Sequence, residues 1–158
     1  MQTTLIVGSV AIWFASLTGF SSAVAQTGCV AVVVNEKNPI TNLSATELRR
    51  VLAGEKHFWT GGLPIRLFVR APGANERDVL LKFLGMSESE YKRYWTAQVF
   101  RGDAQMEPVG LFSNGMQREA VVLYPGAVAL VNLQDVKLGM KVLKIDGHMP
   151  AETGYPFN

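Results

Sequence analysis

The sequence predicts an α/β domain, in which a mixed, mostly parallel sheet carries helices on its faces. Two continuous apolar, β-branched runs at residues 29–35 and 127–131 are typical of strands that are covered on both faces. Amphipathic segments with helix-capping signals lie between these runs. The resulting order, β-α-β-α-α-α-β-β, favours a sheet with helices packed on it.

The first half of the chain holds two predicted strands and one predicted helix. The run 29–35 is the first strand, and the alternation of apolar residues over 65–70 predicts the second. Between them, Ser44 and Glu47 have the spacing of a capping box, in which each residue bonds the backbone N–H of the other. The helix that follows is expected to end at Gly54.

Two further helices are expected after the second strand. The first begins near Glu76 and stops at Gly85. The second opens at another capping box, formed by Ser87 and Glu90. Its aromatic and apolar stripe is interpreted as core packing and consists of Tyr91, Trp95 and Val99.

The last part of the chain predicts one helix and two strands. Ser113 or Asn114 is expected to cap the helix, and Pro125-Gly126 ends it. The apolar run 127–131 follows as a strand, and residues 142–145 are predicted to form a last, edge strand.

Residues 1–25 have the pattern of a signal peptide. They contain no charged side chain, and an apolar run ends before the small-residue sequence Ala23-Val-Ala25. We therefore expect cleavage between Ala25 and Gln26 and export to the periplasm. The alternative is a retained anchor, because the stretch also has the length of about 20 residues that spans a bilayer. Membrane contact is expected only through this segment.

The remaining chain is expected to form one domain over residues 26–146, followed by a loose polar tail over 147–158. A net charge of +2 gives no basis for a nucleic-acid partner. Cys29 is the single cysteine, so no intramolecular disulfide is possible. His57 and His148 have no neighbours at metal-ligand spacing, and the sequence predicts neither a metal site nor a cofactor.

An ordered set of residues resembles the phosphate-binding proteins of phosphate ABC transporters. The resemblance covers about residues 29–133 and is closest to short, exported members of that family. The residues that carry it are Val33-Val-Asn35, Asn38-Pro39, Leu43-Ser44, Glu47-Leu48, Gly54, Trp59, Gly62, Ile65, Arg70, Tyr94-Trp95, Phe100, Gly102, Pro108 and Pro125-Gly126-Ala127-Val128.

The resemblance implies a non-enzymatic, single-lobe domain of the type II periplasmic-binding-protein fold. Full-length members of the family have two lobes that close on the anion, and this chain has room for one. The resemblance implies that half of an anion site remains in the turn after the second strand. Helix starts suit anions because they offer unpaired N–H groups and a partial positive charge.

The candidate anion-binding residues in this turn are Arg70, Gly73, Ala74, Asn75 and Arg77. Arg70 and Gly73 fit the family pattern, whereas Ala74 and Asn75 stand where hydroxyl residues are usual. Glu76 brings a carboxylate into the first helical turn, where it would repel an anion, and Arg77 would partly offset it. Tight phosphate binding is therefore not expected. In the alternative interpretation, Asn75 is an ordinary helix cap and both arginines are surface charges.

Three functions remain open from the sequence. The first is weak phosphate or oxyanion binding, or an accessory role in envelope phosphate uptake or sensing. The second is an envelope protein–protein interaction module without a small ligand, for which Phe58 and Trp59 are a candidate contact surface. The favoured alternative for Trp59 is that it folds back on the core. The third, an enzyme, has little support because His57 lies in a loop and His148 in the tail.

Overall fold

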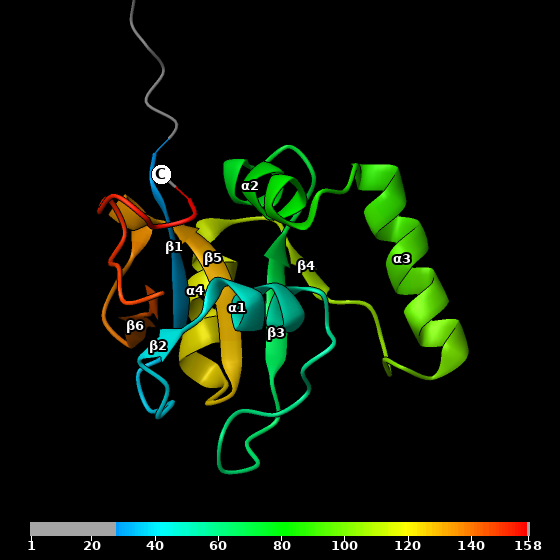
Figure 1. The fold of residues 1–158 in the computed structure, drawn as a ribbon, viewed down its shortest axis with the longest axis horizontal. Helices are drawn as coiled ribbons and strands as arrows, with labels where there is room; N and C mark the ends of the chain where they lie inside the picture. Colours follow the sequence, from blue (N-terminus) through cyan, green and yellow to red (C-terminus); the bar gives the residue numbers. More distant parts are fainter. Residues whose placement is uncertain (1–27, 158) are drawn as a thin grey trace, which may run out of the picture.

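The computed structural model of the protein describes residues 28–157. The predicted signal segment and its cleavage point lie outside these residues. The described chain forms one sheet of five strands with helices on both faces (Figure 1). The α/β class predicted from the sequence is therefore confirmed.

The five-stranded sheet has the order β4-β3-β5-β1-β6. Its strands are β1 Val30–Asn35, β3 Arg66–Arg70, β4 Val109–Leu111, β5 Ala127–Asn132 and β6 Met140–Val142. β3 pairs in parallel with both β4 and β5, whereas β1 runs antiparallel to β5 and β6. The sheet is thus mixed, and β1 is the strand that runs against the other four.

The prediction of a single edge strand over residues 142–145 is wrong. Its residues are divided between β6 and a second, small sheet, in which β7 Lys144–Ile145 pairs in parallel with β2 Asn42–Leu43. Leu143 lies between the two strands, is fully buried, and donates its N–H to the Val32 carbonyl. The chain therefore changes sheets at a buried residue, which a strand-like pattern does not reveal.

The helices are α1 Ala45–Leu52, α2 Asn75–Leu84, α3 Glu88–Arg101 and α4 Asn114–Leu123. Both capping boxes are present, Ser44 with Glu47 and Ser87 with Glu90. The Ser113 hydroxyl caps α4 by accepting the N–H of Met116. Each of these helix starts is encoded within four residues, which is why the sequence predicted them correctly.

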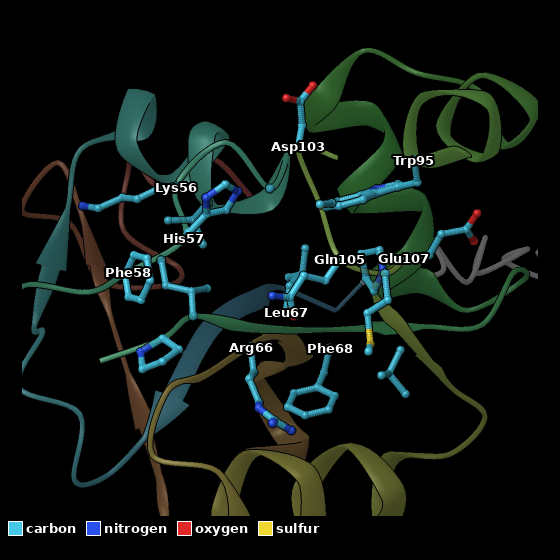
Figure 2. A pocket seen from close by; sticks show the side chains of 18 of the residues that line it. Lys56, His57, Phe58, Arg66, Leu67, Phe68, Trp95, Asp103, Gln105 and Glu107 are labelled. Atoms are coloured by element: carbon cyan, nitrogen blue, oxygen red, sulfur yellow. The ribbon is translucent and has the colours of Figure 1, made fainter. Parts of the chain in front are cut away.

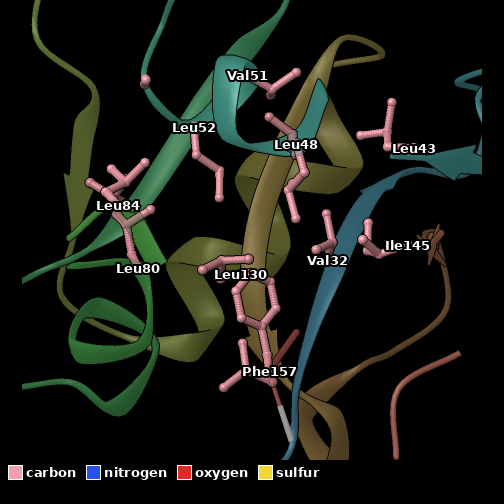
Figure 3. Close-up of a cluster of buried hydrophobic side chains, with 14 of the residues drawn as sticks. Val32, Leu43, Leu48, Val51, Leu52, Leu80, Leu84, Leu130, Ile145 and Phe157 are labelled. Carbon is pink, nitrogen blue, oxygen red and sulfur yellow. The ribbon is translucent and has the colours of Figure 1, made fainter. Parts of the chain in front are cut away.

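The hydrophobic core lies on both faces of β1. Val32 and its neighbours at alternate positions pack with α1 and α2 on one face (Figure 3), and Ala31 and Val33 pack with Val121 of α4 on the other. All residues of β1 up to Val34 are 0% exposed. A strand buried on both faces explains the continuous apolar run in the sequence.

The helix α3 lies beyond the edge strand β4 (Figure 1). Its residues Tyr91 and Trp95 are buried, as predicted, but Val99 is exposed and Gln98 is buried in its place. The expected stripe therefore ends one turn early. Gln98 lies seven residues after Tyr91 and continues its buried face, whereas Val99 lies at the edge of that face.

The C-terminal segment, expected to be loose, packs against β1. Tyr155 and Phe157 are buried, and the Val32 N–H donates to the Tyr155 hydroxyl at 2.9 Å. The Phe157 carbonyl accepts the N–H of Val30 at 3.3 Å. The segment continues the edge of β1 beyond the end of β6, and this contact joins positions more than a hundred residues apart. Within residues 28–157, no helix is long and apolar enough to cross a membrane.

Replacing Tyr155 with phenylalanine should lower the free energy of unfolding by about 1–3 kcal/mol, because the buried Val32 N–H would lose its acceptor. Urea unfolding followed by circular dichroism measures this change. Tyr124→Phe is the matched control, because its ring stacks on Phe68 while its hydroxyl makes no hydrogen bond among the described residues. Equal stability of Tyr155→Phe and the original protein would contradict the assigned role of the hydroxyl.

Candidate functional site

The predicted turn between β3 and α2 is present at the carboxyl end of β3. The Ala71 N–H donates to the Leu111 carbonyl at 2.9 Å, which fixes the turn against β4. Gly73 has a φ of +90°, a conformation that side chains other than glycine rarely adopt. Ligands of open α/β sheets usually bind at this edge, outside the carboxyl ends of the strands. The turn is thus formed as the resemblance implied.

The carboxylate of Glu76 lies inside this turn and is only 3% exposed. Its Oε2 lies 3.8 Å from the Nε of Arg70, and its Oε1 accepts a hydrogen bond from the Asn132 side chain at 3.0 Å. Arg70 also donates from Nη1 to the Leu111 carbonyl at 3.3 Å. The positive charge of Arg70 is therefore matched by a carboxylate of the same chain.

Asn75 is the first residue of α2, and Ala74 occupies the cap position without a side-chain hydrogen bond. The interpretation of Asn75 as an ordinary helix cap is therefore wrong. Its amide instead donates to the Asn132 side chain at 2.9 Å. Arg70, Asn75, Glu76 and Asn132 form one connected group, which we call the Arg70–Glu76 cluster.

Sequence reasoning missed Asn132. It ends β5, which lies beside β3 in parallel, so its side chain emerges at the same edge as Arg70. A polar residue directly after the apolar run 127–131 was the available signal. The pairing of β3 with β5, which makes that signal meaningful, is not visible in the sequence.

Arg77 belongs neither to the anion turn nor to the surface. It is 6% exposed, donates to both carboxylate oxygens of Glu88 at 3.0 and 2.5 Å, and lies 4.1 Å over the Tyr91 ring. The hydrogen bond from Arg77 lowers the pKa of Glu88. Burial lowers the pKa of Arg77, but its contacts with Glu88 and Tyr91 raise it overall. Arg77 is therefore a structural link between α2 and α3.

A small cavity beside the Arg70–Glu76 cluster is lined by Arg70, Glu76 and core residues that include Leu52, Leu80 and Leu130. Its volume of about 10 Å³ is about enough for one water molecule. Among residues 28–157, no group of three or more histidine, cysteine, aspartate or glutamate side chains is arranged to hold a metal ion.

A larger cavity of about 590 Å³ lies between α3 and the amino-terminal end of β3 (Figure 2). The loops 54–58 and 102–108 form its two sides, and Leu67 and Trp95 line its interior. Sequence reasoning did not find this cavity, because it depends on how far α3 stands from the sheet. The Trp59 side chain is not part of it; Trp59 is 2% exposed and donates to the Gly126 carbonyl at 3.0 Å.

Several solved structures share this fold. The ABC-type phosphate transport receptor from Vibrio cholerae aligns with a TM-score of 0.62 at 22% identity, over 78% of this chain and 48% of the receptor. A putative phosphate ABC transporter substrate-binding protein from Clostridium perfringens, which holds bound phosphate, aligns with a TM-score of 0.62 at 17% identity, over 76% of this chain and 46% of that protein. PstS from Borrelia burgdorferi aligns with a TM-score of 0.58 at 21% identity, over 78% of this chain and 49% of PstS.

The fold matches one lobe of a PstS-like binding protein. The chain spans about half the length of each of these proteins. The resemblance to phosphate-binding proteins noted in the sequence is thereby confirmed at the level of the fold. No family model matches the sequence.

The contact between Glu88 and Arg77 should make stability depend on pH. Because the folded-state pKa of Glu88 is lowered, the stabilisation is present above its unfolded pKa and is lost as pH falls through the folded pKa. Glu88→Gln should therefore lower the melting temperature at about pH 7, and this difference should shrink below about pH 4. Glu119→Gln, on the exposed side of α4, is the control. If Glu88→Gln lowered the melting temperature by the same amount at both pH values, the charge of Glu88 would have no role in this stabilisation.

Proposed function

We propose that the protein is an exported, non-enzymatic binding module that acts in the cell envelope by contacting another protein, without phosphate as its ligand. The observation that carries this proposal is the Glu76 carboxylate, buried at the start of α2 and facing Arg70. The chain supplies its own anion at the position where the resemblance implied an external one.

Electrostatics at this turn disfavour phosphate. A helix start and an arginine attract an anion, but a carboxylate in the same turn repels it. Displacing Glu76 from Arg70 would leave a buried carboxylate without its cation, which is strongly destabilising.

Export is supported by the pattern of residues 1–25 and by the fold shared with transport receptors. A role through a partner is supported by the exposed apolar side chains around the 590 Å³ cavity, among them Phe58 and Met106.

Weak oxyanion binding, as an accessory to phosphate uptake or sensing, is the second candidate. It is favoured by the glycine turn at the start of α2 and by the bound phosphate in the Clostridium perfringens protein of similar fold. The two candidates differ in one measurable property, the response of the folded protein to phosphate.

Phosphate should not raise the melting temperature of the full chain. In a protein with a working site, a ligand at about 100 times its dissociation constant adds about 2.7 kcal/mol to the free energy of unfolding. Glu76→Thr should gain a phosphate response of about 0.3–1 kcal/mol, because repulsion is removed and a hydroxyl is added at the helix start. Thermal unfolding with phosphate, sulfate or chloride at constant ionic strength measures both.

Glu76→Gln is the matched variant that removes the charge but keeps the volume, and it separates repulsion from lack of space. Arg70→Ala combined with Glu76→Thr should lose the gained response. A phosphate-specific rise in the melting temperature of the unaltered protein would overturn the proposed function and establish the oxyanion candidate.

A further inference from the structure

We propose that a single ordered water molecule bridges Arg70 and Glu76, so that the two charges meet through water instead of in direct contact. The water accepts the Nε–H of Arg70 and donates to Oε2 of Glu76. This inference goes beyond the proposed function and does not depend on the partner-binding role. It assigns a specific occupant to the buried gap in the Arg70–Glu76 cluster.

The Nε–H of Arg70 is a buried donor without a hydrogen-bond partner among the described residues. The side chain is 13% exposed, and Oε2 of Glu76 lies 3.8 Å from Nε. This separation is too long for a direct hydrogen bond, which joins nitrogen and oxygen at about 2.7–3.2 Å. A buried donor on a charged group is destabilising when it has no acceptor. An acceptor is therefore expected in the gap between the two side chains.

The strand order keeps the two side chains apart, because β3 lies between β4 and β5 (Figure 1). On the β4 side, Nη1 of Arg70 donates to the Leu111 carbonyl at 3.3 Å. On the β5 side, Oε1 of Glu76 accepts a hydrogen bond from the Asn132 side chain at 3.0 Å, and Asn132 itself accepts one from Asn75 at 2.9 Å. Each charge is thus held toward a different neighbouring strand, and this arrangement maintains the gap.

The space beside the gap has the size of one water molecule. The small cavity that Arg70 and Glu76 line has a volume of about 10 Å³, and a single water needs about 10–15 Å³. An oxygen atom at about 2.8 Å from both Nε and Oε2 is geometrically possible, because two such distances together exceed 3.8 Å. The remaining lining includes the apolar side chains of Leu80 and Leu130, which offer a second water no hydrogen bond.

The two polar groups define the chemistry of the occupant. The Nε–H of Arg70 needs an acceptor, and the Glu76 carboxylate needs a donor, so the occupant must be both. The carboxylate would repel an anion, and the guanidinium would repel a cation. A bridging water is the usual connection between polar groups that lie more than about 3.5 Å apart. Water is therefore the small neutral molecule that fits the charges and the volume.

The first experiment is a crystal structure of the unaltered chain at a resolution that shows ordered water. We expect one peak of water density at hydrogen-bond distance from both Nε of Arg70 and Oε2 of Glu76. A direct hydrogen bond between these two atoms would overturn the proposal. A gap that persists without water density would overturn it as well.

The second experiment detects the same water in solution by nuclear magnetic resonance of the full chain with isotope-labelled arginine. The Nε–H of Arg70 should show cross-relaxation with a long-lived water molecule. Arg77 is the internal control, because it is also buried but its Nε donates directly to Glu88 at 3.0 Å. Arg70→Lys removes the Nε–H and identifies its signal. Absence of water cross-relaxation at both arginines would exclude the bridge.

Asn132→Ala removes the contact that holds Glu76 toward β5. The carboxylate can then move to Arg70, so we expect a direct hydrogen bond and loss of the water signal at the arginine. Asn75→Ala, which removes the support of Asn132, is the second variant if Asn132→Ala does not fold, and it should weaken the same signal. Asn114→Ala is the control, because its amide donates to Asp135 at 2.7 Å, outside the cluster.

An unchanged water signal in both Asn132→Ala and Asn75→Ala would overturn the assigned role of Asn132 in holding the gap open. These experiments contain no phosphate, so their outcome is independent of the melting experiment that tests the proposed function. A missing bridge would leave the proposed function standing, and a phosphate response of the unaltered protein would overturn that function alone.

Discussion

The burial of β1 on both faces is the constraint on which the rest of the structure depends. β1 pairs with β5 on one side and β6 on the other, and its alternate side chains supply both halves of the core. A strand without solvent contact needs a partner for each N–H group. Where β6 ends, the Tyr155 hydroxyl accepts the N–H of Val32. The C-terminal segment is therefore part of the fold.

The same pairing determines what the carboxyl edge of the sheet can do. β5 lies between β1 and β3, so Asn132 at its end is held beside Arg70 and the first turn of α2. All the elements of an anion site are present, namely a helix start, an arginine and a glycine turn. The Glu76 carboxylate lies 3.8 Å from Arg70 in this turn, so the chain places an anion of its own beside the arginine. A chain can therefore share the fold of the phosphate-binding proteins without sharing their ligand.

The sequence predicted the features that depend on a few adjacent residues. The capping boxes at Ser44 and Ser87 and the buried run of β1 follow from local patterns. The errors concern contacts between distant segments. Arg77 was assigned to the anion turn because no sequence pattern places Glu88 and Tyr91 around it. The sequence correctly places Glu76 in the first turn of α2. Its partner Asn132 required the strand order to be known.

The two ends of β3 differ in how much open space lies beside them. At Arg70, the guanidinium faces the Glu76 carboxylate at 3.8 Å and donates from Nη1 to the Leu111 carbonyl, while its buried Nε has no hydrogen-bond partner among the described residues. At the other end, the Leu67 side chain lines a cavity of about 590 Å³ with an apolar rim. Burying apolar surface stabilises an association in proportion to the area removed from water. By this measure, an apolar surface that covered the rim at the Leu67 end would gain association free energy in proportion to the area it buries.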